Sequence, residues 1–190
     1  LTSLKPEATN LLDGMVRLRL TTSGYEKEIL EKNLQAEFEK LKELVSDILV
    51  ADEDKGLPEM LGVVLKERNK TMATAESCTG GYIAHLITAV PGSSAYYKGS
   101  IISYANEVKE HLLDVLPETL QTVGAVSEET VTQMVKGVIG QLEVDYALAT
   151  SGIMGPDGGT PEKPVGTVWV AAGNKEKIVT RQFQFRFGRE

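Results

Sequence analysis

The feature that most constrains the fold is the regular alternation of strand-like and helix-like segments after residue 57. Five segments have the length and apolar character of strands, at residues 71–75, 100–105, 146–150, 165–172 and 177–187. Between them, helical patterns occur at residues 58–65, 80–89, 106–113 and 128–142. Residues 146–150 are apolar without alternation, so both faces of that strand are expected to be covered. This order of elements predicts an α/β fold, a three-layer αβα domain with a mostly parallel mixed sheet.

The first 56 residues have a different organisation. Residues 15–20 alternate between apolar and polar side chains, which predicts a half-buried strand, and residues 21–24 are expected to form a turn. A long helix follows, with an apolar face of Leu30, Leu34, Phe38, Leu41, Val45 and Ile48 and a solvated face of Glu and Lys. Residues 48–51 are also compatible with a second strand. Because residues 52–56 form a polar linker, we expect a small α+β fragment over 1–56 and a larger domain over 57–190.

The composition argues against several classes of function. A net charge of −7 disfavours binding to a nucleic-acid backbone, which requires a basic surface. No apolar run approaches the roughly 20 residues of a membrane span, and the polar, irregular residues 1–10 do not resemble a signal peptide. The single cysteine, Cys78, suits a reducing cytoplasm, and with His85 and His111 it gives no metal-ligand cluster. We therefore expect a cytoplasmic protein with no metal, no nucleic acid and no membrane among its partners.

The strongest candidate for chemistry is Ser77, within the stretch Ala75-Glu76-Ser77-Cys78-Thr79-Gly80-Gly81. This serine lies at a strand-to-helix turn, where unpaired backbone N–H groups at the helix start favour negative charge. A serine nucleophile needs such donors for an oxyanion, together with a base. The amides from Thr79 to Gly81 are the expected donors, since glycine lets a substrate approach the backbone closely. The alternative is that Ser77 or Thr79 only caps the helix.

The partners of Ser77 are less obvious from the sequence. Cys78 is a competing nucleophile, because a cysteine at a helix start can acquire a lowered pKa, but it is interpreted as a packing residue. His85 and His111 are expected on the surface. Lys109 follows a buried-looking strand, and active sites of open α/β sheets collect at the carboxyl ends of strands. Lys109 is therefore the candidate base, since burial lowers the pKa of a lysine; the alternative is a solvated lysine.

A glycine-rich loop is the third candidate feature. Residues 150–161 follow a strand directly and contain Gly152, Gly155, Gly158 and Gly159 together with two prolines. Such a loop presents backbone N–H groups to an anion or shapes a pocket wall, and the alternative is a long structural turn. It is not a Walker loop, because it lacks the Gly-Lys-Ser/Thr ending.

Six motifs of the chain, in order, resemble those of one protein family. They are Ala75-Glu76-Ser77-Cys78-Thr79-Gly80-Gly81, Pro91-Gly92-Ser93-Ser94, Ser103-Tyr104-Ala105-Asn106-Glu107-Val108-Lys109, Gly124-Ala125-Val126-Ser127, Ser151-Gly152-Ile153-Met154-Gly155-Pro156-Asp157-Gly158-Gly159 and Lys163-Pro164-Val165-Gly166-Thr167-Val168-Trp169. Together they are similar to the C-terminal domain of CinA, the competence/damage-inducible protein, over residues 57–190. The stand-alone form of this domain is the bacterial nicotinamide mononucleotide deamidase, PncC.

The resemblance implies an amidohydrolase of pyridine nucleotide salvage, which converts nicotinamide mononucleotide to nicotinic acid mononucleotide and ammonia. The family's serine–lysine pair falls on Ser77 and Lys109, and Tyr104 falls on a tyrosine that would be a pocket wall or proton relay. The expected substrate-binding residues are Thr79, Gly80, Gly81, Gly152 and Gly155. No metal or other cofactor is implied. Family precedent, the acidic surface and exposed sheet edges predict a homo-oligomer.

The resemblance also bears on the two ends of the chain. Residues 1–56 are similar to the end of the small middle domain of CinA. Residues 185–189 depart from the family's spacing and no final helix follows, so the C-terminal domain is expected to be truncated. Two other functions stay open: a non-catalytic nucleotide- or partner-binding module linked to competence and DNA damage, and a cysteine-dependent amidohydrolase that uses Cys78.

Overall fold

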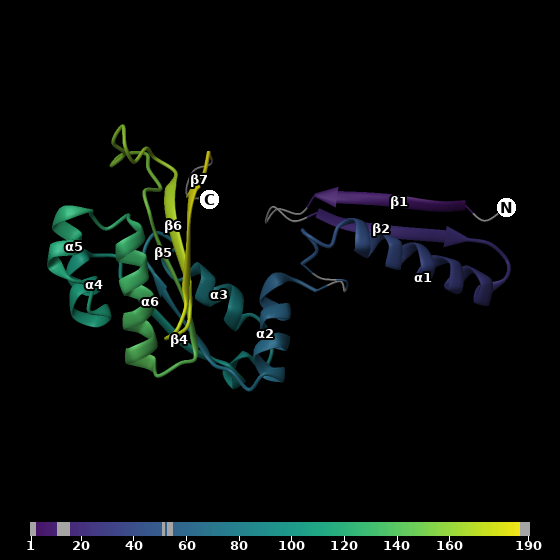
Figure 1. The fold of residues 1–190 in the computed structure, drawn as a ribbon, viewed down its shortest axis with the longest axis horizontal. Coiled ribbons are helices and arrows are strands. Elements are labelled where there is room, and N and C mark those ends of the chain that lie inside the picture. The colour runs from purple at the N-terminus through teal and green to yellow at the C-terminus, as the bar shows by residue number, and fades with distance from the viewer. Residues whose placement is uncertain (1–2, 11–15, 51, 53–54, 187–190) are drawn as a thin grey trace. The chain divides into compact units, whose positions relative to one another are not determined.

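The computed structural model describes residues 3–10, 16–50, 52 and 55–186. The chain divides into two compact units, Leu1–Lys55 and Gly56–Glu190, whose helices and strands are labelled in Figure 1. Met15, Ala51 and residues 187–190 lie outside the described residues. The described residues also exclude most of residues 185–189, the segment that departs from the family's spacing. They exclude part of the expected linker at residues 52–56 as well.

The first unit consists of two antiparallel strands, β1 (Ser3–Asn10) and β2 (Val16–Ser23), and helix α1 (Lys27–Leu44). One expectation is wrong here: residues 21–23 belong to β2 and not to a turn. The strand at residues 3–10 has no counterpart among the expected elements. The two strands pair over their whole length, from Ser3 opposite Ser23 to Asn10 opposite Val16, and this pairing defines β1 although its sequence has no apolar alternation. Helix α1 ends at Leu44, and Ile48 lies beyond it with 73% of its surface exposed. Residues 48–50 form no strand.

The second unit alternates strands and helices. Its strands are β3 (Met72–Glu76), β4 (Tyr97–Ile102), β5 (Tyr146–Gly152), β6 (Thr167–Gly173) and β7 (Ile178–Gln184). Its helices are α2 (Leu57–Glu67), α3 (Tyr82–Thr88), α4 (Asn106–Leu113), α5 (Pro117–Thr122) and α6 (Glu128–Leu142), with a 3-10 turn, η1 (Ser93–Ala95), before β4. Strand β4 begins earlier than the expected 100–105, and α5 has no counterpart among the expected segments.

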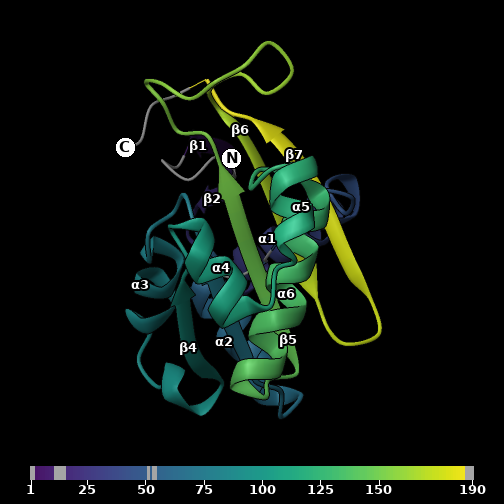
Figure 2. The ribbon, with the colours of Figure 1, turned by 90° about the vertical axis from the view of Figure 1, so that its left-hand side faces the viewer.

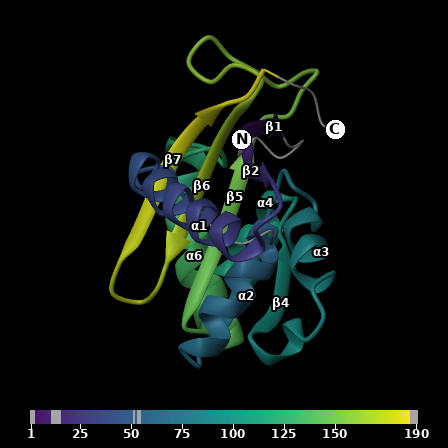
Figure 3. The same ribbon diagram turned by 90° about the vertical axis from the view of Figure 1, so that its right-hand side faces the viewer.

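The five strands form one mixed sheet in the order β4-β3-β5-β6-β7. Strand β3 pairs parallel with β4 and with β5, and β6 and β7 add antiparallel strands beyond β5. Helices α4, α5 and α6 lie on one face of the sheet (Figure 2), and α2 and α3 lie on the opposite face (Figure 3). The predicted three-layer αβα domain with a mixed sheet is confirmed, and the expected small α+β fragment before it consists of two strands and helix α1. Within the described residues, no helix combines the length and hydropathy needed to cross a membrane.

A separate hydrophobic core fills each side of the sheet. On one side, α6 packs Val131, Met134, Val135 and Val138 against small strand residues, namely Ala73, Ala75, Ala147, Ala149 and Ala171. The other core consists of Leu65, Met72, Ile87, Tyr96 and Tyr97. Helix α4 approaches α6 most closely at Gly137, where a Cβ atom would overlap the carbonyl oxygen of Leu113. A glycine in α6 therefore sets the position of the helix that carries Lys109.

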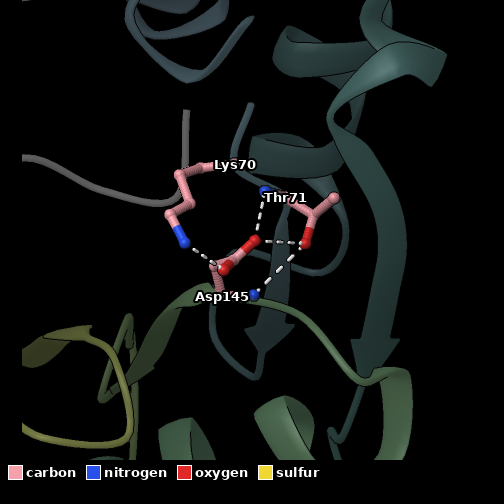
Figure 4. A network of polar contacts seen from close by, with 3 residues as sticks. All are labelled: Lys70, Thr71 and Asp145. Carbon is pink, nitrogen blue, oxygen red and sulfur yellow. Dashed lines mark hydrogen bonds and ion pairs between the residues drawn. The ribbon is translucent and has the colours of Figure 1, made fainter. Parts of the chain in front are cut away.

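A polar network fixes the amino ends of β3 and β5 side by side (Figure 4). The Asp145 carboxylate accepts hydrogen bonds from Lys70 Nζ at 2.7 Å, Thr71 N at 2.9 Å and Thr71 Oγ1 at 3.0 Å. The N–H of Asp145 donates to Thr71 Oγ1 in return, at 3.2 Å. The network joins the amino ends of the two parallel strands, at the end of the sheet opposite Ser77 and Ser151.

Candidate active site

Ser77 follows β3 directly, at the carboxyl end of the sheet. It is 8% exposed and lines a cavity of about 180 Å³. The cavity is lined by Ser77, Cys78, Tyr104, Asn106, Lys109, Ala125, Val126, Ser151, Gly152 and Met154. These residues come from the ends of β3 and β5, from α4 and its approach, and from the segment before α6. The predicted meeting place at the carboxyl ends of the strands is therefore where the cavity lies.

The Lys109 side chain reaches Ser77 from helix α4. Its Nζ lies 3.2 Å from Ser77 Oγ, 2.7 Å from the carbonyl oxygen of Ser103 and 3.2 Å from that of Tyr104. Lys109 is only 1% exposed, and among the described residues no carboxylate forms an ion pair with it. A lysine held in this way is surrounded by neutral acceptors and by a hydroxyl group.

Burial is the main influence on the pKa values of Lys109 and of the neighbouring Cys78. Desolvation lowers the pKa of Lys109 from its usual value, and the weaker influences of Cys78 and Glu107 act in the opposite direction. Desolvation raises the pKa of the Cys78 thiol, which favours the protonated, unreactive form. The environment thus favours a neutral amine beside Ser77 and disfavours a thiolate at Cys78.

The backbone amides after Ser77 differ in their availability. The N–H of Gly80 donates to the Ser77 carbonyl oxygen at 3.2 Å, and the N–H of Gly81 donates to the Glu76 carboxylate at 3.0 Å. Among the described residues, the amide of Thr79 donates to no acceptor, and the amide of Cys78 interacts only with its own thiol. Of the expected donors from Thr79 to Gly81, the amides of Gly80 and Gly81 are therefore not available, because both already have an acceptor.

The other predicted site residues lie at different distances from the cavity. Tyr104 and Gly152 line it, and the Gly152 Cα has room for no side chain because Val168 and Cys78 lie against it. The other predicted substrate-binding residues are not among the lining residues, namely Thr79, Gly80, Gly81 and Gly155. Gly155 has a positive φ of 72° and packs against Val165. His85 and His111 are exposed and away from the cavity, as expected for surface histidines.

Several lining residues did not stand out as site residues in the sequence. Asn106 begins α4, and Ser151 lies in β5 with its Oγ donating to the Ala125 carbonyl oxygen at 2.8 Å. That bond ties the segment before α6 to the end of β5. The available sequence signal for Ser151 is its position at the start of the glycine-rich stretch at residues 150–161. Cys78, interpreted from the sequence as a packing residue, also contacts the cavity.

A larger hollow, of about 450 Å³, lies at the opposite end of the sheet. Its lining includes Lys70 and Asp145, which are paired with each other, and no serine or cysteine. It offers no nucleophile with a base, so the smaller cavity is the better candidate for chemistry. Among the described residues, no three His, Cys, Asp or Glu side chains are grouped as metal ligands.

The family model that matches this chain is described as the CinA C-terminal domain, and it covers residues 54–190. A CinA-like protein of Cytophaga hutchinsonii is 46% identical over 177 residues, which are 93% of this chain and 42% of the relative. A putative competence-damage inducible protein of Halothermothrix orenii is 42% identical over 175 residues, again 42% of its length. The chain thus spans about two fifths of the curated relatives that it matches.

Solved structures show the same similarity. The competence/damage inducible protein CihA of Agrobacterium tumefaciens has a TM-score of 0.68 at 35% identity, over 73% of this chain and 88% of that protein. A competence-damaged protein (CinA) superfamily protein of Escherichia coli has a TM-score of 0.69 at 30% identity, over 75% of this chain and 84% of that protein.

Proposed function

Since the chain belongs to the CinA C-terminal domain family, we propose that its second unit is an amidohydrolase that acts on nicotinamide mononucleotide. The products would be nicotinic acid mononucleotide and ammonia. The contact between Lys109 Nζ and Ser77 Oγ, 3.2 Å long and buried, is the observation that carries this proposal. Nucleophilic catalysis by serine requires a base within hydrogen-bond reach, and no histidine contacts the cavity.

The surroundings of Lys109 suit a neutral amine. A neutral lysine has two N–H donors and one lone pair, and two backbone carbonyl oxygens lie within hydrogen-bond distance of Nζ. If these oxygens take both donors, the lone pair is left for the Ser77 hydroxyl proton. Burial supplies the energetic reason, because desolvation disfavours the charged form of the amine.

The proposed reaction is an acyl transfer in two halves. Ser77 Oγ attacks the carboxamide carbon while Lys109 accepts the hydroxyl proton, and the proton then passes to the departing nitrogen, which leaves as ammonia. A water molecule attacks the resulting ester, again with Lys109 as base, and releases the carboxylic acid and Ser77. One water is consumed and one ammonia is formed for each amide hydrolysed.

The amides of Cys78 and Thr79 are the proposed oxyanion donors. They are adjacent to the nucleophile, and the amide of the residue after a nucleophile serves this purpose in other serine hydrolases built on strand-to-helix turns. Loss of one oxyanion donor costs ~100- to 1000-fold in rate. Tyr104 and Gly152 would form walls of the same pocket, and Gly80 and Gly81 would shape the turn beneath it.

The size of the cavity is consistent with a substrate that is only partly enclosed. A volume of about 180 Å³ is below the 300–1,000 Å³ common for pockets that enclose a whole drug-sized ligand. The carboxamide and its ring would therefore enter the cavity, and the ribose phosphate would lie at its mouth.

Ammonia release from nicotinamide mononucleotide tests this function directly. The wild-type chain should release ammonia, and Ser77→Ala should not, while both bind the nucleotide in calorimetry. Binding without turnover by the wild-type chain would instead support a non-catalytic nucleotide-binding module. Loss of activity on alkylation of Cys78, with Ser77→Ala still active, would support a cysteine-dependent amidohydrolase.

A further inference from the structure

Glu76 is a fully buried carboxylate that the proposed mechanism does not use. It is the last residue of β3 and is 0% exposed. No cation forms an ion pair with it among the described residues. A buried carboxylate without a cation is costly unless hydrogen bonds compensate for its lost hydration, so its partners indicate why it is there.

The partners of Glu76 are mainly the first N–H groups of helix α3. Oε2 accepts from Gly81 N at 3.0 Å and Ile83 N at 3.1 Å, and Oε1 accepts from Ala84 N at 2.8 Å. These amides belong to the N-cap residue and the second and third helical positions. The helix has no side-chain cap of the usual kind, so Glu76 provides the cap from five residues before the N-cap.

Hydroxyl groups complete the shell of the carboxylate. Thr79 Oγ1 donates to Oε2 at 2.7 Å, and Ser100 Oγ and Thr74 Oγ1 each lie 3.3 Å from Oε1. Thr79 also bonds the hydroxyl of Thr150 on β5, at 2.9 Å. The turn from Ser77 to Gly81 is therefore tied to β3 through Glu76 and to the neighbouring strand β5 through Thr79.

These ties leave two consecutive amides unused. Ser77 N donates to the Thr150 carbonyl oxygen at 3.0 Å, and the amides of Gly80 and Gly81 are engaged as described above. Between these fixed points lie Cys78 and Thr79, and among the described residues neither amide donates to another residue; the Cys78 amide interacts only with its own thiol. The turn is held at both of its ends while its middle keeps the donors that an oxyanion needs.

We propose that Glu76 is a positioning residue for the reaction: its carboxylate holds the turn so that Ser77 Oγ and the amides of Cys78 and Thr79 face the same reacting carbon. This inference rests on the proposed function for its substrate. It predicts that removing a hydrogen bond of the Glu76 carboxylate lowers the rate of the acyl-transfer step. Binding of the nucleotide, which precedes that step, should change little.

Glu76→Gln tests the proposal with a minimal change of shape. Each carboxylate oxygen accepts a backbone N–H of α3, so the NH₂ group of glutamine faces at least one such donor in either orientation. The variant therefore loses at least one hydrogen bond from α3, while the side chain keeps its volume. The matched control is Asp145→Asn, which makes the same chemical change at the other end of β3 and β5, away from the cavity.

The expected result is a split between kcat and KM. Glu76→Gln should lower kcat by ~100-fold, the size of a displaced oxyanion donor, with little change in KM. The pH midpoint of kcat should stay at the wild-type value, because Lys109 is not the group that moves. Asp145→Asn should keep the wild-type kcat below its own unfolding temperature. A Glu76→Gln variant that folds and retains wild-type kcat overturns the proposal, and so does an equal loss of kcat in Asp145→Asn.

A second variant and a second probe cover the remaining outcomes. If Glu76→Gln does not fold, Thr79→Val removes the shortest tie, and Thr79→Ser restores its hydroxyl; kcat should fall in the first and recover in the second. Equal kcat in both overturns the proposal.

Labelling of Ser77 by a fluorophosphonate, followed by mass spectrometry, needs no nucleotide. Rapid labelling of wild type without ammonia release rejects the proposed substrate, yet slower labelling of Glu76→Gln still supports positioning. Wild type that neither labels nor turns over overturns both.

Discussion

Lys109 Nζ and Ser77 Oγ lie 3.2 Å apart, and neither atom has a charged partner among the described residues. The two residues are separated by 32 positions in the sequence and meet because β3 and β4 are parallel neighbours. Each follows the carboxyl end of its own strand, Ser77 at once and Lys109 after the first turn of α4. The pair is thus a consequence of sheet topology.

The first prediction concerns the charge of Lys109. Burial lowers its pKa, so the neutral fraction of the amine grows as pH rises, and kcat should rise with it through a midpoint below the ordinary value of about 10.4. Lys109→Arg should lower kcat by ~100- to 10,000-fold, because guanidinium keeps its proton and cannot act as a base. Steady-state rates of ammonia release between pH 6 and 10 measure both effects. An arginine variant with substantial kcat and an altered KM would leave Lys109 as a binding residue only.

The second prediction separates the two candidate nucleophiles. Ser77→Ala should reduce kcat by a factor of about 10⁴ or more, since it removes the attacking atom itself. Cys78→Ala should keep most of the activity, because burial raises the pKa of its thiol and the proposed mechanism uses only its backbone amide. Circular dichroism of both variants checks that the fold is retained. The reverse pattern of activities would assign the nucleophile to Cys78.

The third prediction concerns the packing that places α4. In Gly137→Ala the new methyl group would overlap the Leu113 carbonyl oxygen, so α4 must move or the helices must separate. We expect a loss of about 1–3 kcal/mol in the free energy of unfolding, as for other overpacked cores, together with a lower kcat. Gly140→Ala, on the same helix with no neighbouring atom within 4 Å, should be neutral or stabilising by up to about 1 kcal/mol. Urea titrations of both variants provide the comparison, and equal stabilities would contradict the assigned contact.

The fourth prediction uses the pH dependence of the Asp145 network. Hydrogen bonds from Lys70 and Thr71 lower the pKa of Asp145 to about 2, below its usual value. A carboxylate with a depressed pKa stabilises the fold above its unfolded-state pKa, and this stability is lost as pH falls through the folded value. The difference between wild type and Asp145→Asn should therefore be full above pH ~4 and should shrink between pH ~4 and ~2. Denaturation midpoints across this range measure it.

A control for the fourth prediction comes from Lys70→Met, which removes one partner of Asp145 and leaves Thr71 in place. This variant should keep part of the pH dependence. Because both side chains of the ion pair remain partly exposed, high salt should weaken the effect of Lys70. A pH profile of Asp145→Asn that stays parallel to wild type would show that Asp145 contributes no such linkage.

The core of the second unit and the proximity of Lys109 to Ser77 could be predicted because their signals are periodic or local. Apolar runs at 71–75 and 146–150 identify interior strands, and the parallel order brings residues at their carboxyl ends together. The helix beginning after Ser77 could be predicted from its apolar spacing. Ser127 could be recognised as an N-cap, and its Oγ accepts the Thr130 N–H at 3.2 Å.

Other features depend on contacts that leave no local pattern. Strand β1 contains few apolar residues and is stabilised by pairing with β2, which a reading of one segment cannot reveal. Glu76 looks like the polar end of a strand, because a cap supplied from five residues before the N-cap has no established sequence signature. The Gly81 amide is engaged by the same carboxylate, and the Gly80 amide is engaged by the Ser77 carbonyl oxygen. Asn106 and Ser151 reach the cavity only through the tertiary fold.

The cap that Glu76 places on α3 also bears on inhibition by inorganic anions. The helix start that would ordinarily attract phosphate or sulfate is filled by the protein's own oxygen atoms. A buffer anion therefore meets no free amide of Gly81, Ile83 or Ala84 at the start of α3. Competition by phosphate or sulfate in an ammonia-release assay would report on the separate groups that hold the phosphate of the nucleotide, and would provide a way to find them.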